Sequence, residues 1–345
     1  MAQERRFEES AYALSIWSTD GCNLRCAYCF YDDESYKNFR FMDEETAKAT
    51  IDFIERTPIQ SLSFFGGEPL LNWKIIELIL NGIKKKIPSS VTTNGILLDE
   101  GKLKYLKGHN THINLSLDGT PETQNKWRDN SYEKILSNME HLIKYENLTI
   151  LKTLVEPHKL YEDICHIRDL GFKNVFINLL DPFSSTIYKL GDLHIFKENY
   201  KKVINIHNKG ININDFERWR DLIKKGTRPG CGFTGLGLGE APDGKLYTCH
   251  QGPSMPEEFS FGDVWSGIDK EKEHQIRKMA ETPKSCMGCV YGFNKCPVTM
   301  WNHHKKFGVE APDWYKIYEI TKIMLIEEAC GLERKLPLCQ MQKIV

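Results

Sequence analysis

The chain has 345 residues, of which 41% are hydrophobic, so it is long enough for one large α/β domain with a smaller appendage. Lysine and arginine number 46 against 47 acidic residues, so no overall positive charge favours nucleic acid or anionic lipid as a partner. Because no run of about 18 uncharged apolar residues occurs and the start lacks an apolar signal core, we expect a cytoplasmic protein without a membrane span.

Short β-branched and aromatic runs alternate with amphipathic stretches between about residues 11 and 180. The candidate strands are 14–18, 62–65, 90–93, 113–117, 149–155 and 175–179. Helical spacing of apolar residues occurs at 44–56, 73–85, 132–145 and 160–170. Strands joined by helical crossovers predict a parallel sheet, whose carboxyl ends gather active-site residues.

The alternation stops after residue 182, where a charged, mostly helical connector begins. Glycine-rich alternation at 231–249 predicts a hairpin of strands 236–238 and 246–248 around the turn Asp243-Gly244. A further helix is expected at 314–330. The predicted domains are 1–190, a connector at 191–227, a small cysteine-rich module at 228–300, and a helical segment at 301–345.

Three cysteines follow the first predicted strand in one short loop, as Cys22-x3-Cys26-x2-Cys29. Three thiolates leave one iron of a four-iron cluster without a protein ligand, and such an open position is a place for chemistry. A structural zinc loop is the alternative, but it requires four ligands and no further Cys or His lies nearby. The eleven cysteines are clustered in a chain without a signal segment, which favours metal ligation over disulfides.

Residues 22–29 resemble the radical S-adenosylmethionine (SAM) superfamily signature, Cys-x3-Cys-x-aromatic-Cys. The resemblance implies a partial (β/α)6 TIM-like barrel in which Cys22, Cys26 and Cys29 hold a [4Fe–4S] cluster that reductively cleaves SAM. It also implies that a 5′-deoxyadenosyl radical then takes a hydrogen atom from the substrate. The aromatic Tyr28 is expected to pack against the adenine of SAM or, alternatively, within the core.

Three further motifs follow successive predicted strands and extend the resemblance over about residues 11–180. Gly66-Gly67-Glu68-Pro69 matches the family's motif for the methionine amine; glycines allow close backbone approach and Glu68 supplies an acceptor. The resemblance further implies that Thr93 and Asn94 contact the ribose and that Ser116 and Arg128 bind the methionine carboxylate. Asn178 is expected either to face the adenine or to be a core amide.

A second cysteine set resembles the SPASM or Twitch extension of radical SAM enzymes, which holds auxiliary [4Fe–4S] clusters. Cys231, Cys249, Cys286 and Cys289 have the spacing of a single-cluster Twitch domain, which is the preferred ligand set. The position of one further SPASM cysteine is occupied by Met300. The remaining Cys296, Cys330 and Cys339 are candidates for a second cluster. A zinc ribbon is the competing interpretation of the Cys286 and Cys289 pair, and Cys165 is expected to be a buried hydrophobic residue.

His250 follows Cys249, at a position where similar sulfatase-maturating enzymes have a proton-accepting aspartate. We expect a histidine here to act as a base or to donate a hydrogen bond to the cluster. Backbone hydrogen bonding is the alternative. The departure from aspartate argues against a sulfatase maturase in particular.

The resemblance implies an oxidoreductase that matures a ribosomally synthesised precursor peptide by crosslinking, epimerisation, oxidation or backbone excision. The alternatives are a Twitch-type dehydrogenase of a small molecule and a non-catalytic iron–sulfur electron carrier. Because about ten residues precede the first predicted strand, we expect a separate leader-recognition protein, or direct contact with the enzyme, to deliver the peptide. An electron donor such as flavodoxin or ferredoxin is also implied.

Overall fold

The computed structural model of the chain describes residues 11–30, 39–180, 190–224, 236–279, 297–308 and 317–331. These residues fall into two compact units. The first unit contains 11–23, 39–114 and 236–279, and the second contains 24–30, 115–180, 190–224, 297–308 and 317–331. The cysteine loop therefore contributes Cys22 to the first unit and Cys26 and Cys29 to the second.

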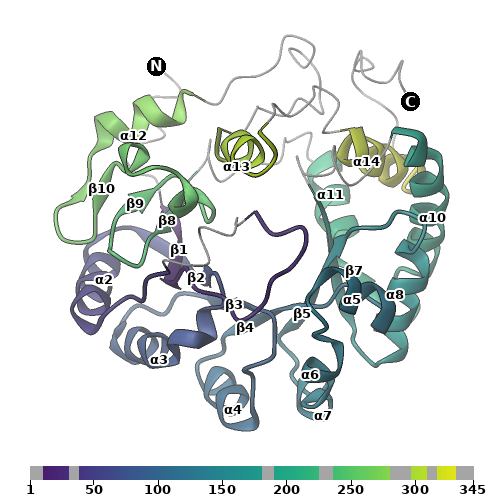
Figure 1. Ribbon diagram of the computed structural model, residues 1–345, viewed down its shortest axis with the longest axis horizontal. Coiled ribbons are helices and arrows are strands. Elements are labelled where there is room, and N and C mark those ends of the chain that lie inside the picture. Colours follow the sequence, from purple (N-terminus) through teal and green to yellow (C-terminus); the bar gives the residue numbers. More distant parts are fainter. Residues whose placement is uncertain are drawn as a thin grey trace. The chain divides into compact units, whose positions relative to one another are not determined.

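Strands and helices alternate in the first unit. Its first three strands are β1 (Tyr12–Thr19), β2 (Ile59–Gly66) and β3 (Ser89–Thr93), and its first helices are α2 (Glu44–Arg56), α3 (Trp73–Gly82) and α4 (Glu100–Gly108). β1 pairs in parallel with β2, and β2 with β3, while the helices lie along one side of these strands (Figure 1). Helix α2 begins at Asp43, whose side chain accepts a hydrogen bond from the Thr46 N–H.

The predicted hairpin is present, and its first strand extends the main sheet. β8 (Gly237–Glu240) pairs in parallel with β1, and β9 (Leu246–Tyr247) pairs antiparallel with β8. Gly244 has φ +77° in the intervening turn, a conformation that glycine adopts without strain. The two short strands β10 (Gly262–Asp263) and β11 (Gly267–Ile268) and helix α12 (Lys270–Arg277) complete this unit.

The second unit is mostly helical around its strands. Its strands are β5 (Leu148–Leu154), β6 (Asn174–Leu179) and β7 (Asn212–Ile213). Its helices are α5 (Pro121–Trp127), α6 (Tyr132–Leu136), α7 (Met139–Leu142), α8 (Leu160–Asp169), α10 (Leu193–Ile206), α11 (Asn214–Lys224), α13 (Pro297–Phe307) and α14 (Ile317–Ala329). β5 pairs in parallel with β6, and β6 with β7.

Strands β1 to β9 form one nine-stranded sheet in the order β7-β6-β5-β4-β3-β2-β1-β8-β9, with β4 at His112–Ser116, and β10 and β11 form a separate two-stranded sheet. The predicted α/β fold with a partial barrel is confirmed, since each predicted strand overlaps one of β1 to β6. The predicted boundaries at 190, 227 and 300 stay predictions.

Two predicted helices are shorter than expected. The stretch 132–145 is split into α6 and α7 at Ser137 and Asn138, where the Ser137 hydroxyl donates to the Lys134 carbonyl at 2.8 Å. The stretch 73–85 ends at Gly82, because the Glu55 carboxylate accepts the backbone N–H groups of Lys84 and Lys85 at 2.7 and 3.2 Å.

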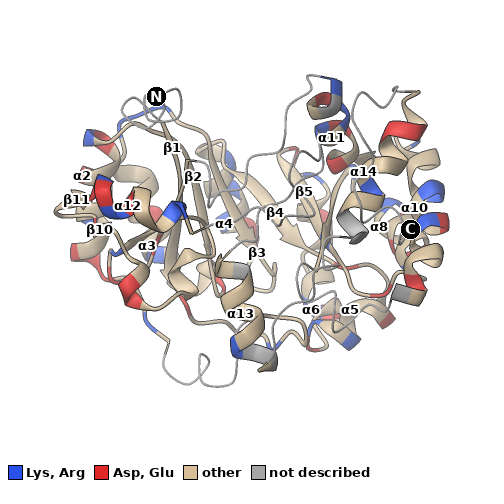
Figure 2. Cartoon of the chain, turned by 90° about the horizontal axis from the view of Figure 1, so that it is seen from above, with Lys and Arg blue, Asp and Glu red and all other residues tan. Residues whose placement is uncertain are grey.

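Acidic and basic residues both occur along the helices of each unit (Figure 2), as in Lys270, Glu271 and Lys272 of α12. Glu273 of the same helix is buried and accepts a hydrogen bond from Arg277 at 3.0 Å. Among the described helices, none combines the length and apolar character that a membrane crossing requires.

Candidate functional site

The cysteine loop follows β1. Cys22, Cys26 and Cys29 are each partly exposed, and the Cys29 N–H donates to the Cys26 carbonyl at 3.0 Å, which makes a tight turn. Burial raises the pKa of the Cys26 thiol to about 11, with Arg128 opposing the shift. Iron coordination deprotonates such a thiol. Over the described ranges, no group of three His, Cys, Asp or Glu residues is arranged around a single ion; a four-iron cluster instead places each thiolate on a separate iron.

The second half of the loop is held to the segment after α5. The Ala27 N–H donates to the Trp127 carbonyl at 3.0 Å, and the Arg25 N–H donates to the Asp129 carboxylate at 3.2 Å. Both contacts are within the second unit. These two hydrogen bonds, at Arg25 and Ala27, hold the backbone on either side of Cys26.

The Gly66-Gly67 segment packs directly against the backbone that precedes Cys22. The Gly67 N–H donates to the Thr19 carbonyl at 3.2 Å, and the Glu68 N–H donates to the Gly21 carbonyl at 2.7 Å. A Cβ at Gly67 would lie 2.0 Å from the Gly21 oxygen, and Gly66 has φ +121°. The positive φ of Gly66 and the close backbone approach at Gly67 therefore both require glycine.

Glu68 is buried and joins the loops that follow β2 and β3. One carboxylate oxygen accepts the Thr93 hydroxyl at 2.7 Å and the Leu70 N–H at 3.1 Å, and the other accepts the Asn94 N–H at 2.7 Å. Burial raises the pKa of Glu68 to about 7, although these donors oppose the shift. A carboxylate has about four acceptor positions, so three protein donors leave room for one further donor such as an ammonium. Pro69 begins the 3₁₀ turn Pro69–Asn72 after this acid.

Asn94 also reaches the cysteine loop within the first unit. Its side-chain N–H donates to the Asn23 side-chain oxygen at 2.7 Å. The residue next to Cys22 is thus tied to the end of β3. Thr93 and Asn94 lie where the sequence places a ribose contact, at the carboxyl end of a parallel strand.

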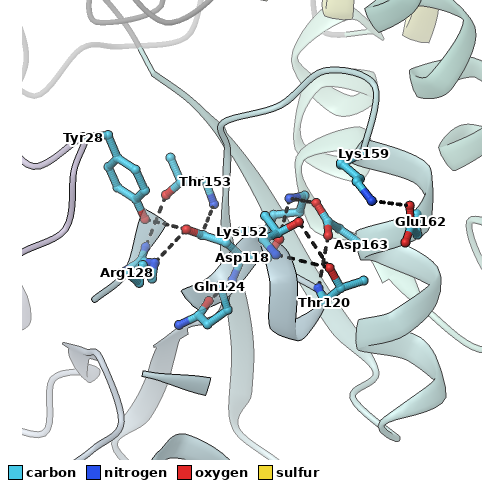
Figure 3. Close-up of polar contacts among 11 residues, drawn as sticks. Tyr28, Asp118, Thr120, Gln124, Arg128, Lys152, Thr153, Lys159, Glu162 and Asp163 are labelled. Atoms are coloured by element: carbon cyan, nitrogen blue, oxygen red, sulfur yellow. Dashed lines mark hydrogen bonds and ion pairs between the residues drawn. The ribbon is translucent and has the colours of Figure 1, made fainter. Parts of the chain in front are cut away.

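Asp118, at the carboxyl end of β4, is the centre of the polar network in the second unit (Figure 3). Its carboxylate accepts the Tyr28 hydroxyl at 2.6 Å and the Arg128 Nε–H at 2.8 Å through one oxygen, and the Thr153 N–H at 2.8 Å through the other. The Arg128 guanidinium also lies over the Tyr28 ring, 5.2 Å from its centroid, and donates to the Thr153 hydroxyl at 3.3 Å. Asp118 is fully buried, so these donors compensate its charge.

A buried lysine supports this network from β5. Lys152 donates to the Asp118 carbonyl and to the Asp163 carboxylate, the latter at 2.8 Å, and both side chains are almost fully buried. Asp163 also accepts the Thr120 N–H at 3.1 Å (Figure 3). Removing either partner would leave a buried charge uncompensated, which is costly.

Asn178 and Ser116 lie at the ends of their strands. Asn178 of β6 is in register with Thr153 of β5, and therefore beside the Asp118 network. It is half-buried, whereas Ser116 at the end of β4 is buried.

His250 lies beside the carboxyl ends of β1 and β2. Its carbonyl accepts the Trp17 indole N–H at 2.7 Å, and its ring meets the Phe65 ring edge to face at 5.0 Å. The side chain keeps an accessible surface, but the surrounding protein desolvates the ring and lowers the pKa to about 4. The imidazole is therefore neutral near pH 7 and a weak base, which favours hydrogen bonding over proton abstraction.

Of the preferred auxiliary ligand set, Cys249 lies within the described residues. Cys249 is buried, and the preceding Thr248 carbonyl accepts a hydrogen bond from Arg277 at 3.1 Å. Among the candidates for a second cluster, Cys330 is described and is partly exposed. The ligand candidates outside the described residues are Cys231, Cys286, Cys289, Cys296 and Cys339.

Four residues of the network were not predicted as site residues from the sequence, namely Asp118, Thr153, Lys152 and Asp163. The available signal for Asp118 was its place directly after a strand end, two residues after Ser116. Charged residues inside the strand and helix at 152 and 163 gave a second signal, since buried charges are rare without partners.

The donor set fits the cofactors that the sequence predicts. Three loop cysteines suit a cluster with one open iron. Glu68 offers an acceptor for an ammonium, and Arg128 offers donors for a carboxylate, which are the two charged groups of the methionine moiety.

Residues 17–171 match the radical SAM superfamily. The cysteine-type anaerobic sulfatase-maturating enzyme of Clostridium perfringens strain 13 is 26% identical over 320 residues, which cover 81% of this chain and 85% of that protein. This similarity is to the class of maturase from which the histidine at position 250 is expected to depart.

Two solved structures show the same fold. Native anSMEcpe with bound AdoMet has a TM-score of 0.74 and 22% identity, covering 93% of this chain and 100% of that one. Streptococcus suis SuiB bound to its precursor peptide SuiA has a TM-score of 0.60 and 17% identity, covering 81% and 70%.

Proposed function

Because this chain is a radical SAM enzyme related to sulfatase maturases, we propose that it modifies a ribosomally synthesised peptide by hydrogen abstraction. The observation that carries the proposal is the similarity to a maturase over 81% of the chain, which extends far beyond residues 17–171. A protein of similar fold, SuiB, is solved with a precursor peptide. The modification is a crosslink, an epimerisation, an oxidation or a backbone excision.

The cofactors are SAM and the [4Fe–4S] cluster, which together supply a 5′-deoxyadenosyl radical when bound. We assign the cluster to Cys22, Cys26 and Cys29. The SAM contacts are assigned to Tyr28, Gly66, Gly67, Glu68, Pro69, Thr93, Asn94, Ser116, Arg128 and Asn178.

Charge complementarity orients the methionine moiety in this proposal. The Glu68 carboxylate accepts the ammonium through its remaining acceptor position. The Arg128 guanidinium has about five N–H donors, and two of them bind Asp118 and Thr153. We assign the remaining donors, with the Ser116 hydroxyl, to the methionine carboxylate.

The C-terminal part of the chain is proposed to hold an auxiliary [4Fe–4S] cluster on Cys231, Cys249, Cys286 and Cys289, with Cys296 as a further candidate. The neutral His250 ring, next to Cys249, is proposed as a hydrogen-bonding group toward the substrate or this cluster. A separate leader-recognition protein and a flavodoxin or ferredoxin complete the proposed set of partners.

Anaerobic reconstitution with iron and sulfide, followed by reduction and addition of SAM, tests the proposal. We expect 5′-deoxyadenosine to form, and to form faster with a short peptide encoded beside the gene, whose mass should change. The matched control is the same peptide with the Cys22→Ala variant. SAM cleavage that no such peptide accelerates, with no change in any peptide mass, would contradict the peptide assignment and leave the radical chemistry intact.

A further inference from the structure

β6 extends further than its neighbour β7. Past the end of β7, the side chains of Asp215 and Lys322 form hydrogen bonds with the edge of β6 that β7 leaves uncovered. The Asn212 N–H donates to the Lys173 carbonyl, and Val175 is in register with Ile213, so odd-numbered residues of β6 direct their backbone groups toward β7. β7 ends at Ile213, because helix α11 begins at the next residue. Ile177 has the same backbone direction, two residues further along β6.

The Ile177 backbone is bound by an ion pair instead. Its N–H donates to the Asp215 carboxylate at 3.4 Å, and its carbonyl accepts from the Lys322 ammonium at 3.4 Å. Asp215 and Lys322 are also 3.4 Å apart, and both side chains are almost fully buried. The Tyr200 hydroxyl donates to Asp215 at 3.1 Å. Helices α10, α11 and α14 thus each supply one side chain to this edge.

The two hydrogen bonds to Ile177 hold β6 in place directly before Asn178. Successive residues of a strand point to opposite faces. Ile177 is fully buried, whereas Asn178 is half-buried and stands in register with Thr153 of the Asp118 network. Without the two bonds to Ile177, the carboxyl end of β6 would lose these hydrogen bonds on the edge that β7 does not reach.

We infer that the Asp215–Lys322 pair is a positioning device for SAM, acting on Asn178 through the Ile177 backbone. The inference rests on the proposed assignment of Asn178 to the SAM site. A buried ion pair contributes little net stability compared with apolar residues of similar volume. The pair is needed here because apolar side chains such as leucine or methionine cannot form hydrogen bonds with the Ile177 N–H and carbonyl.

The test uses the reconstituted full chain and SAM binding without substrate. The double variant Asp215→Leu with Lys322→Met replaces the pair by apolar side chains and leaves no buried charge unpaired, so it should stay folded. Its unfolding midpoint should fall, because the Ile177 backbone groups and the Tyr200 hydroxyl lose these partners. We expect the dissociation constant of SAM to rise roughly tenfold and the Ile177 amide to exchange faster with solvent. The matched control is Lys201→Met with Glu328→Leu, an exposed pair 3.3 Å apart on α10 and α14, which should leave SAM binding unchanged.

A thermodynamic cycle with Asn178→Ala identifies the route. If the pair acts through Asn178, the triple variant binds SAM about as weakly as Asn178→Ala alone. Wild-type affinity in the Asp215 and Lys322 double variant, or effects that multiply in the triple variant, would overturn the inference. Wild-type affinity in Asn178→Ala would overturn the site assignment itself, and the inference with it.

Discussion

The backbone N–H of Asn94 donates a 2.7 Å hydrogen bond to the buried Glu68 carboxylate. Through this one side chain, the loop after β2 is joined to the loop after β3. Thr93 donates to the other carboxylate oxygen at 2.7 Å, so both residues at the end of β3 are bound to the same side chain. Glu68 is therefore both a proposed SAM ligand and the support of two further proposed ligands.

Replacing Glu68 by glutamine should disturb both roles. Glu68 accepts hydrogen bonds from Leu70, Thr93 and Asn94 through both of its carboxylate oxygens. In the glutamine variant one of these oxygens is replaced by an NH₂ group, which is itself a donor and would face a donor of the protein. We expect the free energy of unfolding to fall by about 1–3 kcal/mol, measured by anaerobic urea unfolding, and SAM binding to weaken at least roughly tenfold, measured by equilibrium dialysis. Glu77→Gln on α3 is the matched control. Unchanged SAM affinity in Glu68→Gln would remove Glu68 from the site.

Gly67→Ala should disrupt the same loop by sterics. Its Cβ would meet the Gly21 carbonyl oxygen at 2.0 Å, so the backbone before Cys22 would have to shift. We expect weaker retention of the loop cluster, measured by iron content after gel filtration, and loss of SAM cleavage. Gly108→Ala is the control, because nothing lies within 4 Å of a Cβ there. An iron content equal to that of Gly108→Ala would argue against the close packing.

The parts of the fold that the sequence predicted are those fixed by local patterns. The six strands follow from short apolar runs, and Cys22, Gly66 and Asn94 could be proposed as site residues because their motifs are contiguous and follow strand ends. The place of β8 beside β1 could not be predicted, because a hairpin pattern does not specify which sheet edge it joins.

The residues missed in the site depend on distant partners. Asp118 binds Tyr28, which is 90 positions away, and Thr153, which is 35 positions away. Asp215 and Lys322 come together only after α11 and α14 pack. Residue spacing and composition do not predict contacts between residues so far apart in the sequence. A contiguous motif, in contrast, identifies residues that act together in one loop.

Tyr28 offers a way to separate ring packing from hydrogen bonding. Tyr28→Phe keeps the ring under Arg128 but removes the 2.6 Å bond to Asp118. We expect unfolding free energy to fall by about 1.5 kcal/mol, while SAM affinity stays within a few-fold of wild type. Tyr28→Ala should lose SAM binding much more strongly. Equal losses in the two variants would show that the hydroxyl, and not the ring, governs binding.

Iron content distinguishes the loop cluster from the auxiliary cluster. Reconstituted wild type should hold about eight irons if one auxiliary [4Fe–4S] cluster is present, and Cys249→Ala about four. Cys165→Ala, which removes a partly exposed cysteine from α8, should keep the wild-type number. Iron counting with Mössbauer spectroscopy measures all three. A content of about four in the wild type would exclude the auxiliary cluster.

Glu240 gives a pH dependence of stability that is independent of the cofactors. It is fully buried, the Thr50 hydroxyl donates to one carboxylate oxygen, and the other oxygen has no hydrogen-bond partner among the described residues. Burial raises the pKa of Glu240 from 4.5 to about 8, and the Asp243 charge adds to the shift. The folded state therefore binds this proton more tightly than the unfolded chain does.

Stability should consequently fall as the pH rises from about 4.5 to about 8, because the unfolded chain ionises in this window while the folded state stays protonated. Glu240→Gln mimics the protonated acid and lacks this loss. We expect the variant to gain a few kcal/mol over wild type across the window, with the difference constant above it, in urea unfolding at a series of pH values. Glu258→Gln, at an exposed position, is the control. A difference between Glu240→Gln and wild type that does not change with pH would show that Glu240 is already ionised in the folded protein.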